Sequence, residues 1–514
     1  MSRASTSPAA PRTVAVVDCG TTSTRAFIAE VGTGGTRVLE DLIVPVDLTD
    51  AFTTGKLDRA AMDGVVAALR GIREAAQGYG VREVRAVGTS GLREASNADV
   101  LLERIRHELG IDVEVIDAAE ESRLYWQALR GLCASCGRTL DGDQLMIEVG
   151  GGGSCIGLIR EGDLVQAVDE HFGTQRIVDI LGDLRDSGDF AVSVDRLALG
   201  SARMMLSRLP PSGPRRLVVT GSAARRVFAQ VTGAEPDDIE PLEPALIERW
   251  VRGQLAATNH QRGADAGSRE LADTLLAGAC LVRHLAAISG ATEVLVPQLT
   301  LRDGLLADLL PGSTGPHHLD ARHLLAEARQ LVRRYGADLP YAENTAELAG
   351  QIFDQCRELH GLGERERALL QFAALVHDIG SYVNVRNRHK HTMYLIQASD
   401  LAGLTGLEKA MVANVARYHR KSPPEPHHQE FTALPRRERV VVSHLAAILR
   451  LAYALDVERD QRIRRVQCRT DRGRLLIRVD RRQIALEQWS MHGKAQLFEE
   501  IFGLQVVVLP REET

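Results

Sequence analysis

Val14-Ala-Val-Val-Asp-Cys-Gly-Thr-Thr-Ser-Thr-Arg25 joins a short run of β-branched residues to a turn rich in hydroxyl groups. The run predicts a buried strand, and the small residues after it predict a tight turn. Backbone N–H groups and hydroxyls in such a turn can surround phosphate oxygens, and the acid at the strand end can orient a metal ion or its water. Strand-Asp-Gly-Thr is also a common turn signal, so this stretch alone leaves both interpretations open. The predicted phosphate-binding residues here are Asp18, Gly20, Thr21, Thr22, Ser23 and Arg25, with Asp18 also a predicted metal ligand.

Two further strand ends repeat this pattern. Ile147-Glu-Val-Gly-Gly-Gly-Gly-Ser154 places an acid before four glycines and a hydroxyl, and Val218-Val-Thr-Gly-Ser-Ala223 again runs from a strand into small residues. Four successive glycines lose much conformational entropy on folding, so they are rarely mere turn filler. Three such turns in one region favour phosphate binding over coincidence. They add Gly150, Gly151, Gly152, Gly153, Ser154, Gly221 and Ser222 to the predicted phosphate site and Glu148 to the predicted metal ligands.

The distribution of strands, helices and histidines predicts the domain organisation. Short β-branched runs alternate with amphipathic helical patterns up to about residue 310, which indicates α/β layering. Only four of the 16 histidines precede residue 311, and the Pro- and Gly-rich segment 310–316 is typical of a linker. Helical patterns then continue to about residue 460. We expect a disordered lead at 1–12, α/β domains at 13–130 and 131–310, an all-α domain at 317–460 and a small α/β domain at 461–514.

The composition is that of an ordinary globular protein of 514 residues, with 44% hydrophobic and 25% charged residues. The 62 basic and 68 acidic residues give a net charge of −6, too mild to favour nucleic acid or a membrane surface by bulk attraction. No uninterrupted apolar stretch reaches the ~18 to 20 residues of a membrane span. Seven scattered cysteines predict reduced thiols, and we assign no role to the lone Cys-x-x-Cys of Cys133 and Cys136. We therefore expect a cytoplasmic protein that binds neither nucleic acid nor membrane.

Beyond these turns, the order of motifs resembles the exopolyphosphatase and guanosine pentaphosphate phosphohydrolase family. The segments Gly88–Asn97 (GTSGLREASN) and Glu114–Arg123 (EVIDAAEESR) lie between the first two turns, and Leu375–Gly380 (LVHDIG) extends the resemblance past the linker. It covers nearly the whole chain from about residue 13. The resemblance implies two actin-like α/β domains with the active cleft between them, followed by a helical HD-type domain. It also implies Mg²⁺-dependent release of terminal phosphate from polyphosphate or guanosine pentaphosphate, and a homodimer.

The resemblance also assigns roles to residues of these motifs. Glu121 matches the family's proposed catalytic base, Glu120 is a neighbour that would support it, and Arg93 would bind the oxygens of the terminal phosphate as a bidentate cation. Without the resemblance, Glu120, Glu121 and Arg123 would be ordinary charges at the start of a helix, where the helix dipole favours acids. Removal of a terminal phosphoryl group needs an aligned water, a base and positive charge, which these residues would supply.

The chain departs from the family pattern around the cleft. Glu148 stands where the family usually has Asp, Cys155 where it has an acid near the metal, and Ala223 where it has a phosphate-facing hydroxyl, while Asp117-Ala118 replaces Ser-Gly. Mg²⁺ prefers hard oxygen ligands, so the Cys155 sulfur is a poor substitute. These departures leave open a catalytically weak regulatory protein that binds polyphosphate or the alarmone. A sugar-kinase-like phosphotransferase is a third alternative, because that superfamily shares the loops.

The region after the linker carries histidines and basic clusters. His377, Asp378, His391, His419 and Asp456 follow the order of HD-hydrolase metal ligands, but no early histidine lies near residues 339–343. We therefore expect a structural or polyphosphate-guiding domain, with His419 in a basic surface. A charge run is usually a solvated face, yet a long polyanion needs a basic track outside the cleft. The predicted track is Arg386, Arg388, Lys390, Arg417, Arg420 and Lys421.

Overall fold

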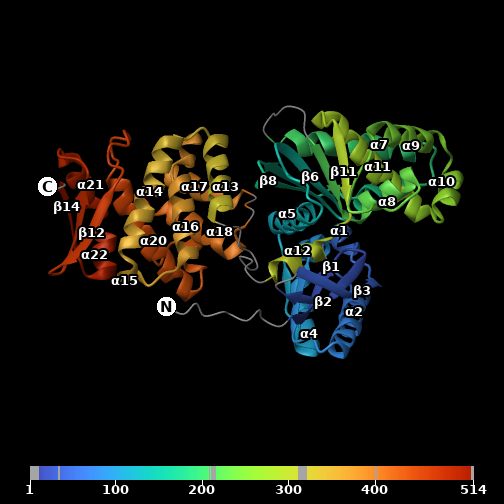
Figure 1. Cartoon of the computed structure of the whole chain (residues 1–514), viewed down its shortest axis with the longest axis horizontal. Helices are drawn as coiled ribbons and strands as arrows, with labels where there is room; N and C mark the ends of the chain where they lie inside the picture. Colours follow the sequence, from blue (N-terminus) through green and yellow to red (C-terminus); the bar gives the residue numbers. More distant parts are fainter. Residues whose placement is uncertain are drawn as a thin grey trace. The chain divides into compact units, whose positions relative to one another are not determined.

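The computed structural model describes residues 11–32, 35–207, 209, 216–310, 321–399, 401 and 403–510. The chain divides into two compact units, residues 1–318 and 319–514 (Figure 1). Each unit has its own hydrophobic core. Residues 1–10 of the predicted lead and the predicted linker after residue 310 lie outside the described residues. The first strand already begins at Arg12, inside the segment that we expected to be disordered.

Unit 1 begins with a mixed five-stranded sheet. Its central strand is buried on both faces, because Val14, Ala15, Val16 and Val17 are all 0% exposed. Two antiparallel strands follow it as a meander on one side, and two parallel strands lie on the other. The strands are β1 (Arg12–Cys19), β2 (Ser23–Gly32), β3 (Gly35–Pro45), β4 (Glu83–Gly88) and β5 (Val113–Val115), in the order β3-β2-β1-β4-β5.

A second sheet in unit 1 repeats this topology. Its first three strands again form an antiparallel meander, and two later strands again add in parallel beside the first, with one extra antiparallel strand at the edge. The strands are β6 (Asp143–Val149), β7 (Ser154–Arg160), β8 (Asp163–Glu170), β9 (Arg216–Thr220), β10 (Ile239–Pro241) and β11 (Glu293–Pro297), in the order β10-β11-β9-β6-β7-β8. The predicted pair of actin-like α/β domains is confirmed.

Helices cover these sheets and connect them. The domain boundary predicted at residue 130 falls inside the helix Ala118–Ser135, and the helix Leu301–Asp308 returns to pack on that helix and on β1. The helix Arg269–Ser289 is long and apolar enough to cross a membrane by length and composition, but 67% of its most apolar window is buried in the core of unit 1. The helices are α1 (Asp50–Thr53), α2 (Arg59–Gly78), α3 (Ser90–Glu94), α4 (Ala98–Leu109), α5 (Ala118–Ser135), α6 (Thr174–Ile180), α7 (Phe190–Ser207), α8 (Gly221–Thr232), α9 (Pro244–Ala256), α10 (Asn259–Ala266), α11 (Arg269–Ser289) and α12 (Leu301–Asp308), with a short 3₁₀ helix at Gly182–Leu184.

Unit 2 is helical and ends in a small three-stranded sheet, as predicted. One continuous apolar core runs from the first helices to the sheet and includes Phe353, Phe372, Ile477 and Phe498. The helices are α13 (Ala321–Arg334), α14 (Leu339–Gln355), α15 (Arg357–His360), α16 (Glu364–Val376), α17 (Arg388–Gln397), α18 (Gly406–Arg417), α19 (Gln429–Thr432), α20 (Arg436–Ala454), α21 (Ala485–Lys494) and α22 (Gln496–Phe502), with a 3₁₀ helix at Ile379–Tyr382. The strands are β12 (Val466–Asp471), β13 (Arg474–Val479) and β14 (Gln505–Pro510).

Candidate active site

The three predicted phosphate turns meet at one cavity in unit 1. The cavity lies where β1, β6 and β9 end, because equivalent strands of the two sheets direct their carboxyl ends to the same place. Its volume is about 80 Å³. The lining residues are Asp18, Gly20, Thr21, Thr22, Ser23, Arg25, Thr89, Ser90, Arg93, Glu121, Tyr125, Glu148, Gly150, Gly151, Gly153, Cys155, Ser222 and Leu301.

The four-glycine turn between β6 and β7 is tightly enclosed. A Cβ atom on Gly152 would lie 2.1 Å from Cζ of Phe52, so no other residue fits there without displacing the ring. The carbonyl oxygens of Gly150 and Gly151 each accept a hydrogen bond of 2.9 Å, from the N–H groups of Thr174 and Gln175 at the start of α6. These contacts hold the turn in one conformation, which is what a preformed phosphate site requires.

Asp18 lies one residue before the end of β1, and its Oδ1 atom is buried although the residue as a whole is partly exposed. Burial raises the pKa of its carboxyl group, although Arg25 and Arg302 act in the opposite direction. No described residue hydrogen-bonds to its Oδ1 atom, and the residue lines the cavity. A buried carboxylate oxygen without a partner is costly, so this position suits a cation.

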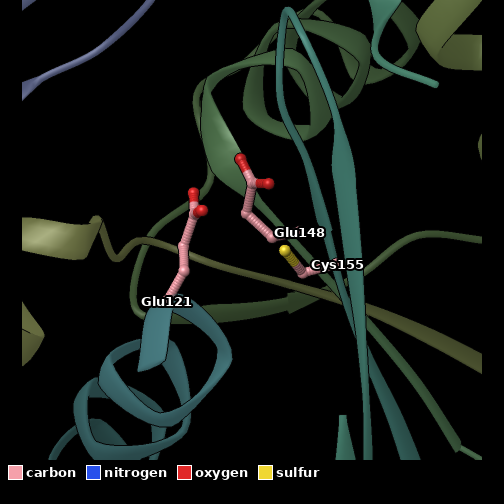
Figure 2. A group of neighbouring side chains, drawn as sticks. All are labelled: Glu121, Glu148 and Cys155. Atoms are coloured by element: carbon pink, nitrogen blue, oxygen red, sulfur yellow. The ribbon is translucent and has the colours of Figure 1, made fainter. Parts of the chain in front are cut away.

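Glu121, Glu148 and Cys155 converge from three elements (Figure 2). One ligand atom from each side chain lies within 4.8 Å of the other two, and all three residues are buried. Glu148 and Cys155 are directly paired across the antiparallel ladder of β6 and β7, which places their side chains on the same face of the sheet. The longer Glu148 fits because Gly221 gives it room: a Cβ there would lie 2.9 Å from Oε1 of Glu148.

The start of α5 positions Glu121. Asp117, one of the departures from the family pattern, is the N-cap residue of this helix and accepts a hydrogen bond of 2.9 Å from the N–H of Glu120. Arg93 Nη1 lies 3.3 Å from Oε2 of Glu121 and donates to the carbonyl oxygen of Ile116 at 2.8 Å. The predicted base and the predicted phosphate-binding cation therefore stand side by side in the cavity wall.

Glu120 points to a different place. Its carboxylate accepts hydrogen bonds of 2.6 and 2.7 Å from Arg123, which also donates to Asp308 on α12 at 3.0 and 2.6 Å. Arg85 completes this buried network with a 2.6 Å bond to Asp308. Glu120 does not line the cavity, so the structure places it in the support of α5 and not at the reacting groups.

Three other predicted phosphate-binding residues also lie behind the cavity wall. Gly152, Ser154 and Gly221 are not among its lining residues, and Ser154 Oγ donates to the carbonyl oxygen of Phe172 at 2.8 Å. The remaining predicted residues of the three turns do line it.

The sequence reasoning missed four lining residues, Thr89, Ser90, Tyr125 and Leu301. Tyr125 stands one helical turn after Glu121, a spacing of four that places both on one face of α5, so the pattern contained this signal. Burial raises the pKa of the Tyr125 hydroxyl well above its usual value, and the nearby Glu148, Asp18 and Glu121 add to this shift. Ser90 Oγ lies 3.2 Å from Thr21 Oγ1, which joins the two hydroxyls at the cavity.

In unit 2, the HD-type positions are engaged by protein groups. Asp378 pairs with Arg388 at 2.6 Å and with Arg459 at 2.9 Å, and Asp456 accepts a 2.8 Å hydrogen bond from Asn344. The ring of His377 packs 5.0 Å from that of His419. His419 is 0% exposed, so the expectation that it belongs to a basic surface is wrong: it is buried among aromatic rings.

The predicted basic track divides into three kinds of residue. Arg388 is largely buried in its pair with Asp378. Lys390, Arg417 and Lys421 line a cavity of about 520 Å³, where Arg417 pairs with Glu430 at 3.0 Å. Arg386 and Arg420 do not line that cavity.

The comparisons with known proteins agree with this architecture. Residues 27–313 match the Ppx/GppA phosphatase family, and residues 325–495 match Ppx/GppA phosphatase, domain III. Two relatives are guanosine-5'-triphosphate,3'-diphosphate pyrophosphatases. The one from Aeromonas hydrophila is 24% identical over 87% of this chain and 88% of its own, and the one from Vibrio campbellii is 26% identical over 88% and 87%.

A solved structure, the Ppx/GppA family member of Aquifex aeolicus, has the same fold. It aligns with a TM-score of 0.50 and 21% identity, and covers 58% of this chain and 98% of its own. The motifs that carried the resemblance, the paired actin-like sheets and the family matches over both units agree. The chain belongs to the Ppx/GppA phosphatase family and is a hydrolase of that family.

Proposed function

We propose that the protein removes the terminal phosphate from a phosphoanhydride chain, either inorganic polyphosphate or guanosine pentaphosphate. The observation that carries this proposal is the pair of Glu121 and Arg93, whose charged atoms lie 3.3 Å apart in the wall of a cavity built from phosphate-type turns. A base and a cation at one such cavity are what transfer of a phosphoryl group to water requires.

The reaction follows from these positions. Arg93 binds oxygens of the terminal phosphoryl group, and Glu121 positions a water in line with the bond to be broken. As the water oxygen bonds to phosphorus, Glu121 accepts its proton. The bond from phosphorus to the bridging oxygen breaks, and the shortened chain leaves with that electron pair. The turns at Gly20–Ser23 and Gly150–Gly153 hold the neighbouring phosphates by backbone N–H groups and hydroxyls.

The carboxylates of the cavity fit a divalent cation. Asp18 offers a buried oxygen without a described partner, and Glu148 also lines the cavity. We propose Mg²⁺, held by Asp18 and Glu148, as the ion of the reaction; when bound, it would neutralise charge on the phosphate oxygens.

A second cavity of about 410 Å³ continues from the first and shares Thr22, Ser23, Arg25, Gly151 and Ser222 with it. Arg226 also lines it, and burial together with repulsion from Arg25 and Arg225 lowers the pKa of that guanidinium. A polyanion would relieve this repulsion. The cavity therefore supports a substrate with several phosphates over a monophosphate.

The proposal includes both guanosine pentaphosphate and inorganic polyphosphate as substrates. Guanosine pentaphosphate is supported by the names of the Aeromonas and Vibrio relatives. Polyphosphate is supported by Arg25 and Arg226 in the second cavity of unit 1 and, within unit 2 taken by itself, by the basic residues that line its own cavity. We propose further that the protein acts in the cytoplasm as a homodimer, as expected from the sequence.

Phosphate release from each substrate with Mg²⁺ tests the proposal. The Glu121→Gln variant should lose turnover but keep substrate affinity, because it loses the proton acceptor and keeps its size. Glu74→Gln, an exposed glutamate on α2, is the matched control and should behave as the unchanged protein. If the unchanged protein binds these substrates but releases phosphate no faster than Glu121→Gln, it is a regulatory binding protein and the hydrolase proposal fails.

A further inference from the structure

We propose that Glu121, Glu148 and Cys155 form a site for a thiophilic divalent cation such as Zn²⁺, and that this ion blocks Mg²⁺-dependent turnover by capturing Glu121. The binding part stands on the side-chain cluster alone. The inhibitory part rests on the proposed function, because it requires Glu121 to be the base.

The chemistry of the three ligand atoms, one sulfur and two carboxylate oxygens, favours one class of divalent cation. Thiolate and carboxylate together suit Zn²⁺ and Co²⁺, whereas Mg²⁺ requires oxygen ligands in near-ideal octahedral geometry. Three protein ligands with a further position left open is also the pattern of zinc sites that exchange ligands. A chain with an acid in place of Cys155 would have no such preference.

The geometry is close to that of a bound ion. Two ligands of one tetrahedral zinc ion, with bonds of about 2.0 to 2.3 Å, lie about 3.3 to 3.8 Å apart. The three ligand atoms here lie within 4.8 Å of one another. Glu148 and Cys155 sit opposite each other on paired strands, so rotations of the side chains that move atoms by about 1 Å would close the site without any change in the sheet.

A second observation points to a cation at the same place. Asp18 lines this cavity, and its buried Oδ1 atom has no described hydrogen-bond partner. A buried carboxylate oxygen in that state is stabilised by a nearby positive charge.

Capture of Glu121 explains why such an ion would inhibit. A carboxylate bound to Zn²⁺ accepts the proton of a water less readily, because its electron pair is shared with the metal. The thiol proton of Cys155 leaves to solvent when the ion binds. Mg²⁺ would be held by Asp18 and Glu148 and not by Glu121, so Glu121 would stay available to accept the proton of the water.

Binding is tested first, on the full chain, with Co²⁺ as the spectroscopic substitute for Zn²⁺. We expect a near-ultraviolet thiolate-to-cobalt charge-transfer band that is lost in Cys155→Ser and weakened in Glu148→Gln. Cys136→Ser is the matched control, because Cys136 is a partly exposed thiol that does not line the cavity, and it should keep the band. No band in the unchanged protein, or a band that survives in Cys155→Ser, overturns the proposal.

Inhibition is tested second, by phosphate release at fixed Mg²⁺ and rising Zn²⁺, with each variant normalised to its own rate without zinc. The Zn²⁺ concentration for half inhibition should rise about tenfold or more in Cys155→Ser, since loss of even a supporting group at a metal site costs about 10- to 100-fold in affinity. Equal inhibition of Cys155→Ser and Cys136→Ser refutes the inhibitory part. A cobalt band without any turnover would instead refute the proposed function and leave the metal site standing.

Discussion

Replacement of Asp308 by Asn should strongly destabilise unit 1, because Asp308 is the acceptor at the centre of a buried network. Its side chain is 0% exposed and accepts bonds of 3.0 and 2.6 Å from Arg123 and 2.6 Å from Arg85. Loss of one partner of a buried ion pair costs about 3 to 5 kcal/mol, since the remaining charges stay desolvated. The uncharged amide of Asn keeps only one acceptor oxygen for these guanidinium groups.

The matched control is Asp63→Asn, the same substitution at the same bond length. Asp63 accepts a 2.6 Å hydrogen bond from Arg104, but its side chain is 49% exposed, so water replaces the lost partner and we expect little change. The comparison isolates burial as the cause.

Hydrogen–deuterium exchange of α5 and α12 measures the effect locally, which avoids treating a chain of two units as a single unfolding transition. A loss of about 3 to 5 kcal/mol corresponds to exchange faster by about a hundredfold to several thousandfold, at 1.36 kcal/mol for each factor of ten. Equal exchange in α5 for Asp308→Asn and Asp63→Asn would refute the reasoning.

Four further expectations follow from the geometry. Arg93→Ala should weaken both substrate binding and turnover in a steady-state assay, because the cation contacts the phosphate in the ground state and in the transition state; unchanged affinity would contradict the assignment. Gly152→Ala should lower turnover without unfolding the protein, because the new Cβ would lie 2.1 Å from a ring carbon of Phe52, and a Phe52→Leu partner substitution should restore part of the rate. A chain that ends at residue 310 should cleave short polyphosphate but lose preference for long chains, and the preference of the full chain should shrink as salt rises; equal preference in both would exclude a guiding track in unit 2. Burial and four nearby cations lower the pKa of His389 to about 4, below an unfolded value near 6.5. The contribution of the neutral ring to stability should therefore be present above about pH 6.5 and lost as the pH falls towards 4. In thermal melts, the His389→Gln variant should show a smaller fall of the melting temperature over this pH range.

The local parts of the site could be predicted from sequence because they depend on neighbours in the chain. The strand that carries Asp18 near its end, and the turn after it, are fixed by a few adjacent residues, and the same holds for the glycine turn that follows the strand of Glu148. The pairing of Glu148 with Cys155 follows from the same hairpin, with four glycines between the strands. These features need no knowledge of distant contacts.

The features that sequence reasoning missed depend on distant partners. Glu120 supports α5 because Asp308, 185 residues beyond Arg123, reaches the same network. Nothing in the Glu-Glu-x-Arg pattern shows which of the two acids faces the cavity. His419 stands in a run of basic residues, but its ring is buried against His377, more than 40 positions earlier in the chain.

The repeated topology of the two sheets in unit 1 has a mechanical consequence. Asp18 and Glu148 lie one residue before the ends of the equivalent first strands of two copies of one architecture, so each copy supplies one half of the predicted phosphate site. Any rotation of one copy against the other changes the span between these halves while every hydrogen bond within each sheet stays intact. A rigid rotation of one copy would therefore be enough to change how tightly the site holds phosphate. The free energy of that rotation is set by the contacts that cross between the copies, such as Phe52 on the four-glycine turn and Glu94 with Arg176.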